Sequence, residues 1–260
     1  MIKNTLLAAT IASGLIVPAK AGVYLPPKPA IIKPENIEFS KNMLAFPFTL
    51  GMLPGKGASG PLYISDTDKT ETSNSTSTRT WSHTTTSDTR CLVVAYGYRT
   101  TDGYKGQFCN FNGVSMTQPS GAYIPYGSTP GGAAGIFYLF DPPIGTFTVS
   151  LSTFSNQRVG ASSINITGTS LGPVAETSGT SSSISSSVVT TQAAVVIAAS
   201  VNIQTSTSTS SMTGTPILDH ADGVVGYGIS YTEPASAGTQ SFTHTYSGSS
   251  RKAMAMAAFY

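Results

Sequence analysis

Residues 91–98 constrain the fold of this chain more than any other stretch. They read Cys-Leu-Val-Val-Ala-Tyr-Gly-Tyr and are apolar at nearly every position. The run is short for a helix and rich in Val and Tyr, so it predicts a strand buried on both faces. Further along, Asn112-Gly113 lies between two short alternating runs. This pair predicts a tight hairpin, because both turn residues need φ > 0.

The rest of the chain contains more short runs of the same kind, separated by Gly, Pro, Ser and Asn. We expect strands near residues 80–83 and at residues 135–140, 146–151, 160–166, 193–199, 224–231, 240–246 and 252–260. The last of these should lie inside a sheet. Asp141-Pro-Pro-Ile-Gly145 predicts a turn between two strands. No stretch shows sustained helical periodicity, so the predicted fold of residues 61–260 is an all-β antiparallel β-sandwich or jelly roll.

The low charge of the chain indicates which kinds of partner it is expected to bind. Only 10% of the residues are charged, against about 25% in ordinary globular domains. The net charge is +2, and no Lys/Arg cluster provides the field that a nucleic acid requires, so we expect no nucleic-acid partner. A surface with so few repelling groups favours a fixed assembly over a free monomer.

Residues 1–60 form a different kind of segment, which we interpret as an extended, Pro-rich arm. Repeated prolines disfavour regular strand pairing, yet the segment carries many large apolar residues that need to be buried. Two interpretations remain: an arm laid across neighbouring subunits, which we favour, or a strap over the chain's own sandwich. The predicted anchor residues are Ile31, Ile32, Ile37, Phe39, Met43, Leu44, Phe46, Phe48 and Leu50.

The first 21 residues have the pattern of a secretory signal. Lys3 supplies the positive end, residues 5–17 form an apolar run, and Ala19-Lys-Ala21 matches a small-x-small cleavage site. The alternative, which we favour, is that the segment stays on the chain and anchors it against another subunit. We expect no membrane partner.

No motif in the chain predicts catalysis, a cofactor or a metal site. The phosphate-binding loop, Cys-x-x-Cys and His-x-x-x-His are absent. Gly168-Thr-Ser-Leu-Gly172 has the spacing of Gly-x-Ser-x-Gly, but no helical pattern follows it, and a nucleophile elbow lies between a strand and a helix. His83, His220 and His244 are far apart in sequence, and we expect each on a strand face or in a loop. The lone Trp81 is expected on a sheet face or in the core.

Two groups of acidic residues are candidate calcium ligands. Asp66 and Asp68 form one group, and Asp219, His220 and Asp222 the other. Oxygen ligands at this spacing suit Ca²⁺, but Asp also caps its own backbone in turns. We favour the turn interpretation, because calcium loops bring more carboxylates.

The two cysteines can be placed by register. If Asp102-Gly103 is a two-residue turn, Cys91 lies opposite Val114 and Cys109 opposite Tyr96. The two sulfur atoms are then not partners in that hairpin. An intrachain disulfide, an interchain disulfide and two buried thiols all remain open.

One loop suggests a surface contact. Tyr123 and Tyr126 precede Gly-Ser-Thr-Pro-Gly-Gly, which ends at Gly132. We predict a flexible aromatic loop here. Its tyrosines either touch a glycan or pack against the domain.

Five motifs occur in order along the chain: Trp81-Ser-His83, residues 91–98, Phe111-Asn-Gly-Val-Ser-Met116, residues 138–149 and residues 253–260. This order resembles a β-sandwich domain of tailed-phage virion proteins, which also occurs in phage-related bacterial reading frames. The resemblance covers roughly residues 78–260. The stretches around residues 32–39 and 46–48 are similar to short virion-associated proteins of phages that infect alphaproteobacteria.

The resemblance implies a structural or appendage protein and carries no catalytic residue. We therefore expect a virion component, such as a collar or neck spike, a fibre or a head decoration. Its expected partners are neck, portal or capsid proteins and copies of itself, with a host-surface glycan as a further candidate. The alternative is a secreted bacterial adhesin or lectin-like module from which residues 1–21 are removed.

Overall fold

The computed structural model describes residues 64–71, 76–100, 107–126, 131–203, 209–221 and 224–260. All of them belong to one compact unit, residues 53–260. The predicted arm with its anchor residues, the signal-like segment and Asp102-Gly103 lie outside the described residues.

The described residues form strands and no helix, which confirms the predicted all-β class. The strands are β1 (Ile64–Glu71), β2 (Thr76–Thr85), β3 (Cys91–Thr100), β4 (Phe108–Phe111), β5 (Val114–Ser115), β6 (Tyr123–Tyr126), β7 (Gly131–Phe140), β8 (Gly145–Ile166), β9 (Leu171–Gly179), β10 (Ser183–Thr190), β11 (Ala194–Asn202), β12 (Thr209–Met212), β13 (Thr215–Ala221), β14 (Gly226–Ala235), β15 (Gly238–Tyr246) and β16 (Lys252–Phe259).

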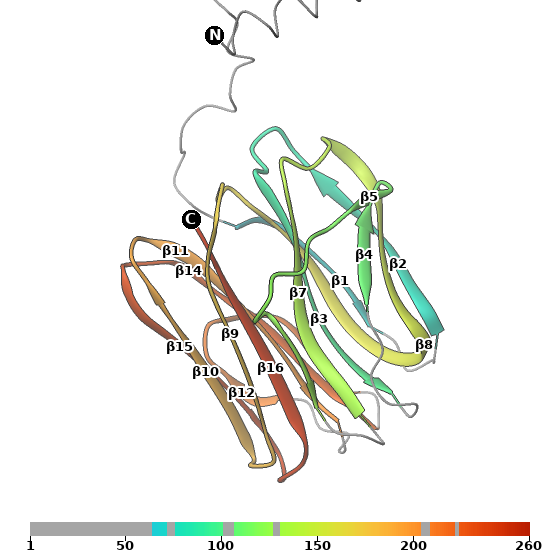
Figure 1. Ribbon diagram of the computed structural model, residues 1–260, viewed down its shortest axis with the longest axis vertical. Helices are drawn as coiled ribbons and strands as arrows, with labels where there is room; N and C mark the ends of the chain where they lie inside the picture. Colours follow the sequence, from blue (N-terminus) through green and yellow to red (C-terminus); the bar gives the residue numbers. More distant parts are fainter. Residues whose placement is uncertain (1–63, 72–75, 101–106, 127–130, 204–208, 222–223) are drawn as a thin grey trace, which may run out of the picture. The chain divides into compact units, whose positions relative to one another are not determined.

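These strands stack as four layers, which we call sheets A to D. The long strand β8 takes part in two of them. Its residues 158–166 pair with β1 and β3, which with β7 and β6 make sheet A. Its residues 145–152 pair with β2 and β4, which with β5 make sheet B. Sheet C has the order β13-β14-β11-β16-β9, and sheet D the order β10-β15-β12. In Figure 1 the layers follow one another from sheet D on the left, through C and A, to B on the right.

Three apolar cores lie between the four layers. Sheets A and C are the inner layers, and each packs against one core on each of its two faces, as β3 shows for sheet A. Alternate residues of a strand point to opposite faces. Leu92 and Val94 therefore lie in the core between sheets A and B, whereas Cys91 and Val93 lie in the core between sheets A and C. Every residue of β3 except Arg99 is buried, which confirms the predicted strand with two covered faces.

The second inner sheet is built in the same way. Ile197 of β11 faces sheet A, and its neighbour Val196 faces sheet D. All residues of β11 and β16 are buried. Since β16 lies between β11 and β9, the expected placement of the C-terminal strand inside a sheet is confirmed.

A pair of glycines allows the two inner sheets to approach closely. Gly97 of β3 and Gly160 of β8 are direct cross-strand partners. The ring of Tyr227, from β14, lies over them: a Cβ on Gly160 would be 2.5 Å from its Cγ atom. The missing side chains thus make room for a fully buried tyrosine.

Two predicted turns are confirmed. Phe111 pairs with Val114 around Asn112-Gly113, whose φ angles are 50° and 77°. Residues 141–144 connect β7 to β8. The pairing of Cys91 with Val114 and of Cys109 with Tyr96, which would follow from a turn at Asp102-Gly103, is not formed, because β7 and β8 occupy both edges of β3 and β4 pairs with β8. The predicted strands at 146–151 and 160–166 are parts of the single strand β8.

Candidate binding face

The outer face of sheet B is an array of hydroxyl groups. Every second residue of β2 points outward, and so does every second residue in the first half of β8. The array members are Thr78, Thr80, Ser82, Thr84, Thr146, Thr148, Ser150 and Ser152. Each β2 member is the direct cross-strand partner of a β8 member, and Thr84 Oγ1 lies 2.7 Å from Thr146 Oγ1. The regular spacing follows from strand geometry, about 4.8 Å across and about 6.8 Å along the strands.

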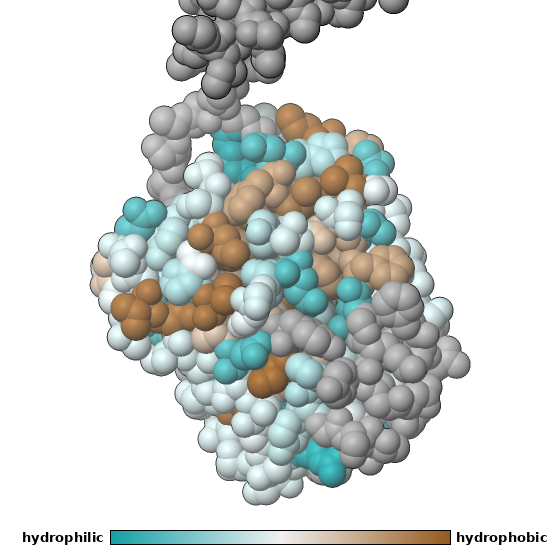
Figure 2. All heavy atoms as spheres, in the orientation of Figure 1, coloured by the Kyte–Doolittle hydropathy of each residue, from teal (hydrophilic) through white to brown (hydrophobic). Residues whose placement is uncertain are grey.

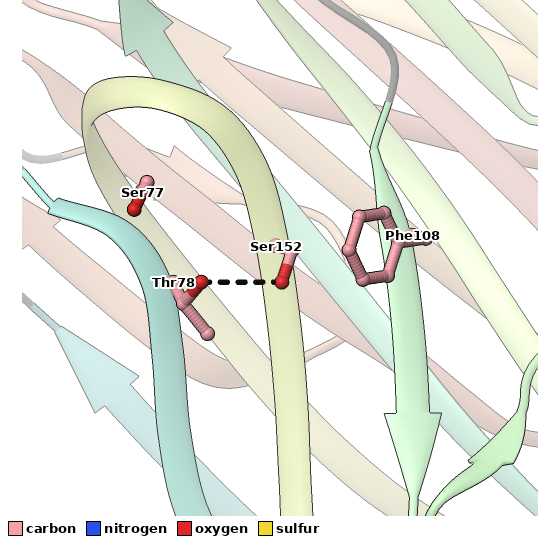
Figure 3. Close-up of a pocket in the computed structure, with 4 residues that line it drawn as sticks. All are labelled: Ser77, Thr78, Phe108 and Ser152. Atoms are coloured by element: carbon pink, nitrogen blue, oxygen red, sulfur yellow. Dashed lines mark hydrogen bonds between the residues drawn. The ribbon is translucent and has the colours of Figure 1, made fainter.

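A hollow of about 290 Å³ lies at one end of this array (Figure 3). It is lined by Ser77, Thr78, Phe108 and Ser152. Thr78, Ser152 and Phe108 lie in one row across β2, β8 and β4. Thr78 Oγ1 lies 3.2 Å from Ser152 Oγ, and the Phe108 ring is 42% exposed beside them. The described lining residues therefore offer an apolar ring and several hydroxyl groups, and none of the four is charged.

A buried histidine joins sheet B to sheet A. His83 projects from the inner face of β2, with Nδ1 2.9 Å from Ser163 Oγ and Nε2 2.8 Å from Asn165 Oδ1. Trp81 Nε1 donates to the same Ser163 Oγ at 2.8 Å, and Asn165 Nδ2 donates to the Thr84 carbonyl at 2.7 Å. With its proton on Nε2, the ring satisfies both of its nitrogen atoms. The expectation that Trp81 lies on a sheet face at the core is confirmed.

A second buried histidine joins sheet D to sheet C in the same way. His244 of β15 has Nδ1 2.5 Å from Ser200 Oγ and Nε2 2.8 Å from Ser230 Oγ. The Tyr246 hydroxyl lies 2.6 Å from Ser200 Oγ. Burial lowers the pKa of His244 to about 3. The His244 side chain is fully buried, and none of these residues lines the hollow.

Lys252 is a buried lysine whose ammonium group binds backbone carbonyl oxygens of two separate segments. Its ammonium group donates to the carbonyl oxygens of Ser181 at 2.6 Å, Gly248 at 3.2 Å and Ser250 at 3.1 Å. It also lies 5.6 Å from the centre of the Tyr246 ring. Desolvation lowers the pKa of Lys252. The side chain thus fastens the turn between β9 and β10 to the segment that precedes β16.

The two cysteines are free thiols that point to different cores. Cys91 lies in the core between sheets A and C, and Cys109 in the core between sheets A and B. Both are fully buried, and burial raises the pKa of each thiol. An intrachain disulfide between them is not formed, and sheet A lies between the two core faces.

Other predicted contact residues lie in strands. Tyr123 and Tyr126 are in β6, which pairs with β7, so the prediction of a flexible loop is wrong for these two tyrosines. Residues 127–130 lie outside the described residues. Tyr126 is half-buried against the core between sheets A and C. A glycan contact by these tyrosines stays a prediction.

The acidic pairs are also in strands, where turns were predicted. Asp66 and Asp68 belong to β1, and Asp219 and His220 to β13, because each segment completes a sheet edge. Asp222 lies outside the described residues. Asp219 still caps a backbone, since its Oδ1 accepts from the Thr209 amide at 2.8 Å. Among the described residues, no three His, Cys, Asp or Glu side chains gather closely enough to hold a metal ion.

The hydroxyl array and Phe108 were not predicted from the sequence. The signal was present, because residues 78–84 alternate Thr or Ser with Arg79, Trp81 and His83. That alternation has the period of a strand with one covered and one open face. The sequence does not specify that β2 pairs with β8. This pairing places the hydroxyl groups of the two strands side by side and so forms the array.

No protein-family model matches this chain, and no curated protein matches it. Within the described part, no helix has the length and apolar character needed to span a membrane.

Proposed function

We propose that this chain is a non-enzymatic structural component of a tailed-phage virion, such as a collar or neck spike, a fibre or a head decoration. It would join neck, portal or capsid proteins and further copies of itself. The fold gives it a rigid body, in which three cores and two buried histidines hold four sheets together. The observation that carries the proposal is the open edge of sheet D.

Strand β10 forms that edge, and its free side is suited to pairing with another strand. Among the described strands it pairs with β15 alone, in unbroken register over all its residues. Its sequence, Ser-Ile-Ser-Ser-Ser-Val-Val-Thr, contains neither charge nor proline. Val189 is 65% exposed, the highest value among the exposed large apolar side chains described. A long, regular, uncharged edge is a template for strand addition.

The other described sheet edges carry features that discourage such pairing. Charged residues and a register shift occur in β1, Arg79 and a shift in β2, and prolines in β6, β9 and β13. Strand β5 has two residues, and β12 has four with a register shift. The contrast singles out β10 as the edge at which assembly would occur.

Figure 2 is consistent with a protein that works in an assembly. Large parts of the visible face are pale, with hydropathy near neutral, and the apolar residues lie in separate patches. With 10% charged residues, little charge repulsion opposes contact between copies.

Labelling of purified phage particles with an antibody against this protein tests the location. We expect label on the neck or the outer surface, and intact mass should show that residues 1–21 are retained. Unlabelled particles, together with a secreted monomer that lacks these residues, would favour the adhesin alternative instead.

A pair of variants tests the assembly edge. We expect the full-length chain to form oligomers in sedimentation experiments, and Val189→Lys to shift them toward monomer. Val114→Lys is the matched control, because Val114 is also exposed but lies in the two-residue strand β5. A monomeric wild-type chain, or an equal effect of both variants, would contradict assembly through β10.

A further inference from the structure

We propose that the outer face of sheet B, centred on the hollow beside Phe108, binds a neutral polysaccharide. This function goes beyond a role in assembly and does not depend on the virion assignment. Three independent properties of the face carry the inference: an exposed aromatic ring, a regular array of hydroxyl groups and the lack of charged side chains.

Phe108 supplies the apolar part of the site. It begins β4 and is 42% exposed, whereas Cys109 and Phe111, on the opposite face of the strand, are fully buried. The ring stands beside Ser152 at the rim of the hollow (Figure 3). A pyranose ring has C–H groups on its faces and hydroxyl groups around its edge, so it can stack on the phenyl ring and keep its hydroxyl groups for other contacts.

The hydroxyl groups supply the polar part. Ser152 is 8% exposed and turns its Oγ atom toward Thr78, on the floor of the hollow. From there the array continues along β2 and β8 to Thr84 and Thr146. Each hydroxyl group both donates and accepts hydrogen bonds, which matches the hydroxyl groups of a sugar. The array is longer than the hollow, so an extended polysaccharide fits the face better than a single sugar.

The charge pattern selects among polysaccharides. The outward side chains of β2, of residues 145–152 in β8 and of β4 contain no Lys, Arg, Asp or Glu. Acidic polysaccharides are held by basic side chains, and this face offers none. A neutral polysaccharide carries no charge, so its binding does not require basic side chains.

Sheet D provides an internal control. Its outer face also carries paired hydroxyl groups, including Ser185 Oγ at 2.8 Å from Thr243 Oγ1. It has no counterpart of the exposed phenyl ring, since Val189 occupies the corresponding end. If hydroxyl groups alone sufficed, both faces would bind.

Affinity electrophoresis of the full chain in native gels tests the proposal, with dextran, galactomannan and mixed-linkage β-glucan as neutral probes and alginate as the acidic probe. We expect at least one neutral polysaccharide to retard the protein and alginate to have no effect. Phe108→Ala should weaken that retardation about tenfold, which corresponds to the loss of one stacked ring. Thr80→Lys should weaken it as well, because it places a charged side chain in the middle of the array.

Two matched variants complete the experiment. Val114→Ala removes another exposed apolar side chain from sheet B, and Ser241→Lys places a charge on the outer face of sheet D. Both should bind like the wild type, and thermal melting should show that all four variants are folded. The proposal is overturned if no neutral probe retards the wild type, if only alginate does, or if Ser241→Lys abolishes binding as Thr80→Lys does.

Discussion

The Nδ1 atom of His244 lies 2.5 Å from the Oγ atom of Ser200, in the space between sheets C and D. On the other side of the stack, the Nδ1 atom of His83 lies 2.9 Å from Ser163 Oγ, between sheets B and A. Each outer sheet is therefore joined to its inner neighbour by one histidine that contacts a serine. Buried polar groups of this kind stabilise a unique arrangement only while every partner is present.

The His244 contact should make stability depend on pH. Its pKa is about 3 in the folded chain, against about 6.5 in the unfolded chain. Between these values the unfolded chain binds a proton that the folded chain does not. The free energy of unfolding should therefore fall as pH falls below about 6.5, by up to about 1.4 kcal/mol per pH unit. Urea unfolding at about pH 7.5 and about pH 5 measures the change.

The control for that experiment is His244→Gln. It should be less stable than the wild type near neutral pH, because Ser200 and Ser230 lose hydrogen-bond partners. Its stability should vary less between the two pH values, since the residue that titrates is gone. An unchanged pH dependence would show that other groups cause it.

Ser163→Ala should destabilise the chain by about 2 kcal/mol. The substitution leaves Trp81 Nε1 and His83 Nδ1 without the oxygen that both contact, in a region closed to water. Ser185→Ala is the matched control, because it removes an exposed hydroxyl group that contacts Thr243. We expect the control to change stability by less than about 0.5 kcal/mol. Equal midpoints of urea unfolding for the two variants would refute the role assigned to Ser163.

Gly160→Ala should cost about 2–3 kcal/mol or prevent folding, because the added Cβ would lie 2.5 Å from Tyr227 Cγ. Gly179→Ala offers a direct comparison, since nothing lies within 4 Å of a Cβ at that position. It should be neutral or slightly stabilising, because alanine restricts the unfolded chain. Thermal unfolding of both variants distinguishes close sheet packing at Gly160 from a general effect of replacing glycine.

The two thiols should be unreactive in the folded chain. Cys91 and Cys109 are fully buried, and burial raises the pKa of each, so little thiolate is present to react. We expect no rapid reaction with a thiol reagent under native conditions and reaction at both positions in denaturant. Non-reducing electrophoresis should show no disulfide-linked dimer. Rapid native labelling would contradict the burial of the thiols, and a dimer that reductant abolishes would favour the interchain bond.

The inner strands were predictable from the sequence because nearly all of their residues are apolar. Residues 91–98 and 252–260 are apolar on both faces, and this pattern in such short runs is typical of covered strands. Strands of the outer sheets carry a weaker signal. In β10 only Ile184 and Val188 point into the core, among serines that also suit loops, and this strand was not predicted.

The layering and the site depend on contacts that no local pattern specifies. Nothing in residues 145–166 indicates that one half pairs with β2 and the other with β3. The row formed by Thr78, Ser152 and Phe108 joins three separate segments of the chain. Each segment alone looks like an ordinary amphipathic strand, so the combination could be recognised only once the pairing was known.

The double membership of β8 also has a consequence for biosynthesis. Strands β1 and β2 are synthesised before β8, which is the only strand with which either pairs in the described structure. Ile64, for example, cannot pair until Ile166 has been synthesised. Pairing over such sequence distances slows folding. The nascent chain therefore leaves the ribosome with unsatisfied strand edges that can aggregate, and rapid synthesis or heating should reduce its yield.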